Sequence, residues 1–277
     1  MINKLVVFNS FAESYKYLAN ELVNNPEYQT SPRGLKINEI LNQTIIINNP
    51  YSNLFSNEIR EPSLRYLKEE LKLYFSGNNK VKDFEAASKF WGKISDDGIT
   101  TNSAYGHLLF VKKNKLTCIT QWEWAKRSLI KDKYTRQAIM HLNRPGHQKD
   151  TLDFPCTMYL NFHIRNNKLN LIVRMRSNDI LFGVFYDYSF FMLLMQCMKL
   201  ELNKVYPELE LGSYTHSADS LHLYEKDFEV IKSALNYQFK EVRIPRISVN
   251  PILNLDNEEF KNSEFKNSEF GKWLISE

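Results

Sequence analysis

The chain has 277 residues, 43% hydrophobic and 25% charged, which is enough for a large folded core in one or two domains. Its formal net charge of +4 is too small to indicate a nucleic acid or a membrane as partner, although it suits a phosphorylated small molecule. Three scattered cysteines argue against a disulfide framework and a zinc cluster, the six histidines lack metal-ligand spacing, and no run approaches the ~18 apolar residues of a membrane span, so we expect a cytoplasmic protein without a metal.

The N-terminal third predicts two helices separated by a strand. Residues 9–25 place apolar side chains at helical spacing, and Ser10 with Glu13 is typical of a capping box. Residues 31–51 begin with turn formers and continue into a β-branched run, which indicates a loop and then a strand. Residues 62–77 open with Pro and Ser, repeat apolar residues at three- and four-residue steps, and stop at a glycine, so they predict the second helix.

The second half predicts a β-hairpin followed by a buried helix. Residues 157–175 alternate apolar and polar side chains on both sides of Asn166-Asn167, a favoured hairpin turn. A run of about fourteen residues from Ser189 is apolar on nearly all sides, and either Asp187 or Ser189 could cap it. Since helices mix with paired strands without a βαβα rhythm, an α+β fold is predicted.

The C-terminal segment contains the unit "EFKNS" repeated over 259–270. Because a solenoid needs three or more stacked units, this repeat is interpreted as part of a surface tail. The expected organisation is one domain over 1–250 and a tail over 251–277.

Three short motifs carry the chemical signal. Cys156 lies in "DFPCTMYLNF", Arg176 in "RMRSND", and His222 and Tyr224 in "HLY". Alone, each has an ordinary explanation: a buried thiol, a solvated arginine and a packing pair. Together, in this order and nearly at these separations, they resemble the thymidylate synthase family from about Arg33 to Tyr224; only the interval from Arg176 to His222 is a few residues longer.

The resemblance implies an α+β fold around a bent mixed sheet, a homodimer packed through that sheet, and 5,10-methylenetetrahydrofolate as co-substrate. Cys156 would be the nucleophile that adds to C6 of a pyrimidine ring, making C5 able to attack the one-carbon donor. Arg176 and Ser177 would bind the nucleotide phosphate, and the guanidinium would favour the thiolate of Cys156.

Two further arginines match phosphate ligands of the family. Arg33, in "SPRG", resembles its mobile phosphate arginine, and Arg136, in "YTRQAI", resembles the arginine that reaches the phosphate across the dimer interface. The sequence departs from the family at the next position, where Gln137 replaces a second arginine, and at Thr157, which follows the nucleophile and is often histidine.

The remaining matches surround the pyrimidine, the sugar and the folate. Glu70 corresponds to a glutamate that organises water and proton transfer, and Tyr105 to a tyrosine near the nucleophile. His222 and Tyr224 would contact the sugar 3′-hydroxyl, which favours a deoxynucleotide. The positions that match folate contacts are Trp91, Asp179, Phe182, Gly183 and Tyr186.

Asp187 is the most specific departure from thymidylate synthases, which typically have asparagine there. An amide can accept from N3–H of uracil and donate to O4, whereas a protonated carboxyl, or a carboxylate facing a protonated N3, matches cytosine. An aspartate here resembles the deoxycytidylate hydroxymethylases, known mostly from viruses, in which water captures the transferred methylene. A viral enzyme would act in the host cytoplasm.

Two alternatives remain open at this point. A thymidylate synthase or a dCMP 5-methylase would use the same covalent chemistry and end in hydride transfer. A family member without activity would serve as a binding or scaffold protein, for RNA or within a nucleotide-synthesis complex.

Overall fold

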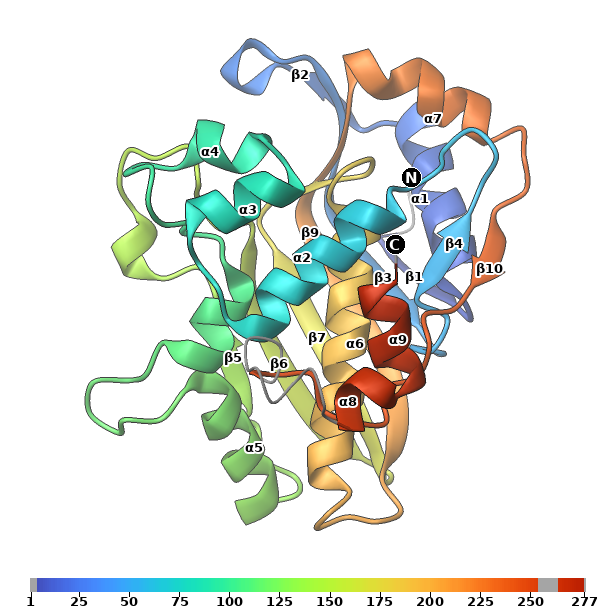
Figure 1. Ribbon diagram of the computed structural model, residues 1–277. Coiled ribbons are helices and arrows are strands. Elements are labelled where there is room, and N and C mark those ends of the chain that lie inside the picture. Colours follow the sequence, from blue (N-terminus) through green and yellow to red (C-terminus); the bar gives the residue numbers. More distant parts are fainter. Residues whose placement is uncertain (1–3, 254–263, 277) are drawn as a thin grey trace. The chain divides into compact units, whose positions relative to one another are not determined.

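A computed structural model describes residues 4–253 and 264–276 (Figure 1). The chain forms two compact units, each assembled from separate stretches of sequence. The first unit contains the residues up to Pro62, Asn170–Met195 and Leu211–Ile244, and the second contains Ser63–Leu169, Gln196–Glu210 and the residues from Pro245 onwards.

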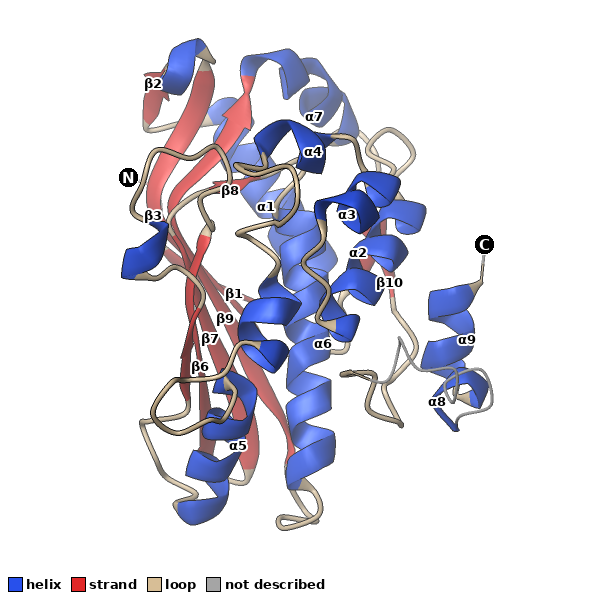
Figure 2. Cartoon of the chain, turned by 60° about the vertical axis from the view of Figure 1, so that its left-hand side comes forward, coloured by secondary structure: helices blue, strands red, loops and turns tan. Residues whose placement is uncertain are grey.

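The first unit is built on a mixed sheet whose strands run in the order β1 (Leu5–Phe8), β3 (Ile37–Ile47), β9 (Glu210–Tyr224) and β7 (Lys168–Met175). The strands are red in Figure 2. Strand β1 is parallel to β3, and β3 is antiparallel to β9. Two short strands extend it, since β2 (Tyr28–Thr30) pairs with β3 and β8 (Asn178–Asp179) pairs with β9. Strands β4 (Leu54–Ser56) and β10 (Lys240–Val242) form a separate two-stranded sheet.

Helix α1 (Phe11–Asn24) begins where the sequence predicts, since Ser10 Oγ accepts a hydrogen bond from Glu13 N–H at 3.2 Å. Its Phe11 ring stacks on Tyr188 at 5.1 Å, in an aromatic core that gives this unit its apolar interior. The other helical segments of the unit are η1 (Pro32–Gly34), η4 (Glu225–Asp227) and α7 (Phe228–Ala234).

Helix α6 (Val184–Leu202) is the predicted buried helix, but it starts five residues before Ser189. The Asp187 N–H donates to the Gly183 carbonyl at 3.0 Å, so Asp187 already lies inside the helix. Ser189 Oγ donates to the carbonyls of Phe185, at 2.9 Å, and Asn53, at 2.8 Å. The expectation that Asp187 or Ser189 caps the helix is therefore wrong, because the apolar residues 184–186 already belong to its first turn.

The second unit is mainly helical. Helix α2 (Leu64–Ser76) agrees with its prediction, because Ser63 Oγ accepts from Tyr66 N–H and Gly77 ends it with a left-handed φ of 72°. The other elements of its first stretch are α3 (Val81–Ala87), α4 (Phe90–Ile94), η2 (His107–Val111), α5 (Gln121–Lys131), β5 (Ile139–His141), η3 (Pro145–His147) and β6 (Thr157–Arg165). Strand β5 is antiparallel to β6.

The predicted hairpin turn is confirmed. Strands β6 and β7 are joined by Asn166 and Asn167 alone, and their φ angles of 49° and 59° are both left-handed, as a type I′ turn requires. Asparagine tolerates this conformation better than most residues, which explains the choice of both turn residues.

The described part of the C-terminal segment is helical and packs on α2, which lies beside it in Figure 1. It consists of α8 (Glu264–Asn267) and α9 (Glu269–Ile275), and the Phe270 ring lies 6.1 Å from that of Phe75. Lys68 Nζ donates to the carbonyl and hydroxyl of Ser276 at 3.0 and 2.8 Å. The first part of the predicted repeat lies outside the described residues, among which no helix is long and apolar enough to cross a membrane.

Candidate active site

In the second unit, Cys156 lies immediately before β6, and its thiol is half-buried. The chain on both sides of it is fixed by hydrogen bonds. Asn143 Nδ2 donates to the Pro155 carbonyl at 3.1 Å, and Thr157 N–H donates to the Tyr105 hydroxyl at 3.2 Å. The structure therefore brings the predicted nucleophile and the predicted tyrosine together.

The position of Tyr105 depends on helix α2. Its ring stacks on Tyr74, with centroids 5.4 Å apart and planes 21° from parallel. The next residue, Gly106, passes so close to the helix that a Cβ would lie 1.7 Å from the Tyr74 carbonyl oxygen. Glycine is required there, which explains the third letter of the "AYGH" motif.

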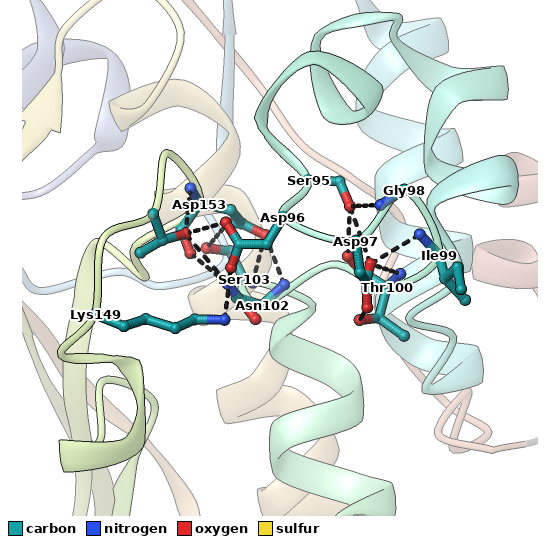
Figure 3. Close-up of polar contacts among 11 residues, drawn as sticks. Ser95, Asp96, Asp97, Gly98, Ile99, Thr100, Asn102, Ser103, Lys149 and Asp153 are labelled. Carbon is teal, nitrogen blue, oxygen red and sulfur yellow. Dashed lines mark hydrogen bonds and ion pairs between the residues drawn. The ribbon is translucent and has the colours of Figure 1, made fainter.

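A polar cluster ties the loop before Tyr105 to the segment before Cys156 (Figure 3). The buried carboxylate of Asp153 accepts from the N–H groups of Asn102, at 2.6 Å, and Ser103, at 3.2 Å, and from Ser103 Oγ at 2.5 Å. Burial raises the pKa of Asp153, while the hydrogen bonds from Ser103 and Asn102 oppose that rise. Since Asp153 lies three residues before Cys156, it links the positions of nucleophile and tyrosine.

The same figure shows two more carboxylates that shape this loop. Asp97 accepts from the N–H groups of Ile99 and Thr100 at 2.8 and 2.7 Å, which closes the tight turn at 95–100. Asp96 is bound by Lys149 Nζ at 2.7 Å and by Thr151 Oγ1 at 2.6 Å. The hydrogen bond from Lys149 holds the pKa of Asp96 down, at about 2.

Glu70 is a buried carboxyl on α2 that receives two phenolic hydrogen bonds. Tyr66 and Tyr74, one helical turn away on either side, donate to Oε1 at 2.9 and 3.3 Å. Trp91 Nε1 donates in turn to the Tyr66 hydroxyl at 3.2 Å. Burial raises the pKa of Glu70 to about 7, although the tyrosine hydrogen bonds oppose it. Trp91, Glu70 and Tyr105 thus share one network, through Tyr66 and Tyr74.

Arg136 lies on an exposed segment between α5 and β5. The neighbouring Gln137 is also exposed, and its carbonyl accepts from Trp124 Nε1 at 2.9 Å. An exposed position is the one that a residue acting on another subunit would need.

In the first unit, β8 aligns the "RSND" motif with the "HLY" motif. Asp179 lies opposite His222 across the parallel β8–β9 pair, and Ile180 N–H donates to the His222 carbonyl at 2.9 Å. Burial raises the pKa of Asp179 and lowers the pKa of His222, and the attraction between the two groups opposes both shifts. The charge of Arg33, on the exposed η1 turn, lowers the pKa of His222 further.

Most of the residues that match folate contacts lie in the segment 179–186, directly after Ser177 and Asn178. Asp179 Oδ1 accepts from Leu181 N–H at 2.8 Å. The Phe182 ring is 60% exposed, and Lys226 Nζ lies 5.7 Å from its centroid and 5.6 Å from that of Tyr224. Tyr186 is buried in the first turn of α6. This surface offers a carboxylate acceptor beside an open aromatic face.

Asp187 has a side-chain partner that sequence reasoning missed. Asn178 Nδ2 donates to Asp187 Oδ2 at 2.8 Å. The glycine between them in sequence makes room for this amide, because a Cβ on Gly183 would lie 2.7 Å from Asn178 Nδ2. The sequence signal was a second amide-bearing residue, Asn178, between Ser177 and Asp179.

Comparison with known proteins decides the family: the thymidylate synthase model matches residues 13–272. The chain belongs to the thymidylate synthase family. The α+β prediction is confirmed by the fold, since thermostable thymidylate synthase A from Bacillus subtilis matches with a TM-score of 0.70, at 19% identity, over 91% of both chains.

Two curated family members are similar in sequence. The deoxycytidylate 5-hydroxymethyltransferase of Enterobacteria phage T6 is 28% identical over 213 residues, which cover 74% of this chain and 82% of that protein. The deoxyuridylate hydroxymethyltransferase of Bacillus phage SP01 is 30% identical over 208 residues, covering 72% of this chain and 53% of that protein.

Family membership establishes the coarse activity, which is one-carbon transfer to a pyrimidine nucleotide with a methylenetetrahydrofolate co-substrate. The residues present fit that co-substrate. The Asp179 carboxylate can accept from N–H groups of a heterocycle, and the exposed Phe182 ring gives it a flat face. Among the described residues, no three His, Cys, Asp or Glu side chains are grouped as a metal site.

Proposed function

We propose that this chain is a deoxycytidylate 5-hydroxymethyltransferase, which converts dCMP to 5-hydroxymethyl-dCMP. The observation that carries the proposal is Asp187, a half-buried carboxyl held by Asn178 at the position where thymidylate synthases typically have asparagine. The names of the two phage relatives support hydroxymethyl transfer, and the phage T6 enzyme supports cytosine as the base.

The chemistry of the base edge explains why a carboxyl favours cytosine. Cytosine presents an acceptor at N3 and a donor at its 4-amino group, so a protonated carboxyl supplies both complementary bonds. Uracil presents a donor at N3 and an acceptor at O4, which an ionised carboxylate repels. A mismatch leaves buried polar groups unpaired, which costs about 1–3 kcal/mol each.

In the proposed reaction, the thiolate of Cys156 adds to C6 of the ring and makes C5 nucleophilic. The Tyr105 hydroxyl, which is bonded to the N–H that follows Cys156, fixes the direction of attack. When bound, 5,10-methylenetetrahydrofolate supplies the one-carbon unit and leaves as tetrahydrofolate. After C5 loses its proton, water adds to the new exocyclic methylene and the sulfur leaves C6.

Glu70 is suited to manage the protons of these steps. With a pKa raised to about 7 by burial, its carboxyl can both donate and accept a proton near neutral pH. The hydrogen bonds from Tyr66 and Tyr74 fix its orientation. We assign it to proton transfer at the ring and to the ordering of the attacking water.

The binding residues follow the family pattern. Arg33, Arg176 and Ser177 bind the phosphate, His222 and Tyr224 bind the 3′-hydroxyl, and a homodimer contributes Arg136 from the partner subunit. One catalytic domain over 1–250 carries these groups. A phage enzyme of this kind acts in the cytoplasm of the host cell. The folate contacts are Trp91, Asp179, Phe182, Gly183 and Tyr186.

The deciding experiment offers the purified protein equal dCMP and dUMP with methylenetetrahydrofolate and resolves the products by mass. We expect 5-hydroxymethyl-dCMP and tetrahydrofolate. The formation of dTMP with dihydrofolate would identify a thymidylate synthase, and 5-methyl-dCMP would identify a methylase. A 5-hydroxymethyl product from dUMP alone would support water as the group that captures the methylene, but it would contradict the selection of cytosine by Asp187. If neither nucleotide were converted, the chain would be a binding protein without this activity.

The matched variant is Asp187→Asn, which exchanges a carboxyl for an amide of the same size. The proposal predicts that kcat/KM for dCMP falls by about 100-fold and that dUMP becomes the better substrate. If the variant kept its dCMP preference, another residue would have to read the base.

A further inference from the structure

Asn178 is a buried amide with an incomplete set of hydrogen bonds. Its side chain is 2% exposed, in the short strand β8 between Ser177 and Asp179. Nδ2 donates to Asp187 Oδ2 at 2.8 Å, whereas Oδ1 is buried without a hydrogen-bond partner among the described residues. The bond to Asp187 is therefore the main polar contact that the amide makes in the described structure.

Backbone contacts fix where this amide lies. Asn178 faces Leu221 across the parallel β8–β9 pair, and the bond from Ile180 N–H to the His222 carbonyl holds the end of β8. Gly183 leaves the space that the amide fills, since a Cβ there would lie 2.7 Å from Nδ2 and 2.9 Å from the Asp179 carbonyl oxygen. Asp187 is fixed as well, one turn into α6. Both partners are thus held by the backbone.

The polarity of the amide distinguishes the two oxygens of the carboxyl. An N–H directed at Oδ2 makes that oxygen an acceptor, whereas Oδ1 of the amide in the same place would repel a carboxylate. When a neutral carboxyl pairs with cytosine, one oxygen accepts from the 4-amino group and the other donates its proton to N3. A donor on Oδ2 favours the proton on the other oxygen and so selects one hydrogen-bonding pattern.

We infer that Asn178 is a positioning residue that sets the base specificity of Asp187. This inference rests on the proposed function, because it assigns to Asn178 the orientation and the proton arrangement of the carboxyl that reads cytosine. Without the donor, the carboxyl at 187 loses the contact that distinguishes its two oxygens, and the distinction between cytosine and uracil weakens.

The test uses Asn178→Leu, which keeps the size and removes the donor, and Asn178→Asp, which keeps the shape and a polar group. Isothermal titration calorimetry with dCMP and dUMP gives the ratio of dissociation constants for each protein. We expect both variants to reduce the dCMP preference by about tenfold or more, mainly through weaker dCMP binding. Thermal melts report whether either substitution reduces folding, and the second variant then carries the test.

Asn53→Leu is the matched control. Asn53 is a buried asparagine of the same unit whose Oδ1 accepts from Ile244 N–H at 3.0 Å. It should lower the melting temperature and leave the dCMP to dUMP ratio unchanged. A wild-type preference for dCMP that persists in both Asn178 variants overturns the inference and leaves the proposed function standing. A wild-type protein that prefers dUMP overturns the proposed function itself.

Discussion

The hydroxyl of Tyr105 accepts a hydrogen bond from the backbone N–H of Thr157 at 3.2 Å, so a side chain from one loop holds the residue that directly follows Cys156. The nucleophile is thereby attached to a stacked pair of tyrosines, because Tyr105 lies on the ring of Tyr74. Chemistry at Cys156 is thus mechanically linked to α2, the helix that carries Glu70.

The first prediction concerns covalent capture. A 5-fluoro pyrimidine deoxynucleotide carries fluorine at C5 in place of the hydrogen that is lost as a proton, and fluorine cannot leave as a cation. With methylenetetrahydrofolate it should therefore trap the wild-type protein as an adduct on Cys156. Cys156→Ala should form none, as intact-protein mass spectrometry can show. Cys118→Ser changes an exposed thiol and should form the adduct normally. An adduct that persists in Cys156→Ala would contradict the assignment of the nucleophile.

The second prediction concerns Asp153, which accepts three hydrogen bonds from Asn102 and Ser103. Asp153→Asn places an amide N–H against these donors, so we expect a loss of about 2–4 kcal/mol in unfolding free energy. We also expect about a tenfold slower formation of the Cys156 adduct, because Tyr105 and Cys156 lose their common support.

The control for that variant lies in the same loop. Asp97→Asn alters the exposed turn at 95–100 without touching the bonds of Asp153. Its adduct should form at the wild-type rate. Equal rates for the two variants would mean that the polar cluster stabilises the loop and has no part in placing the nucleophile.

The third prediction follows from the raised pKa of Glu70. The folded protein holds this proton up to pH of about 7, whereas the unfolded chain releases it near 4.5. Between these values the native state binds more protons, so stability falls as pH rises, by up to about 3 kcal/mol. Glu70→Gln stays neutral and should lose this slope, which urea unfolding at pH 5 and pH 8 would measure.

Glu69→Gln provides the comparison, because Glu69 is half-buried on the same helix and pairs with Lys72 at 2.7 Å. It should keep the pH dependence of the wild type. If Glu70→Gln and wild type lost stability in parallel between pH 5 and pH 8, the raised pKa of Glu70 would be wrong.

The fourth prediction tests the proposed dimer. Arg136→Ala and Cys156→Ala should each be inactive, since each removes a group that every site needs. After mixing and subunit exchange, half of the dimers contain one of each chain, and one site in such a dimer has both groups. About a quarter of the wild-type activity should return. If no activity returned although exchange was complete, Arg136 would act within its own subunit.

Local signals explain which elements could be predicted from the sequence. Helix α2 has a serine cap, a helical apolar repeat and a terminal glycine within fifteen residues, Ser63 to Gly77, and its bounds agree with expectation. Helix α6 has no such signal at its start, since residues 184–186 are apolar and merge with the run that follows. The sequence therefore places the start of the helix at Asp187 or Ser189, after its true first turn.

The site divides in the same way. Cys156, Arg176 and His222 belong to motifs that can be recognised by order and spacing, but only some of the supporting residues can. Tyr66 and Tyr74 lie four residues on either side of Glu70, a spacing that predicts side-chain contact on a helix. Their hydrogen bonds to Glu70 could therefore be predicted from the sequence. Asn178 and Asp187 meet only because β8 and α6 turn back on each other through Gly183, and that requires the fold.

The position of Asp187 inside α6 has a consequence for how specificity can change. The Asp187 N–H donates a hydrogen bond to the Gly183 carbonyl, as in any helix. The backbone at this point therefore does not depend on which side chain position 187 carries. Folding and base choice are therefore assigned to different atoms of one residue. In the proposed function, one codon is enough to move the preference of the chain between a cytosine and a uracil substrate.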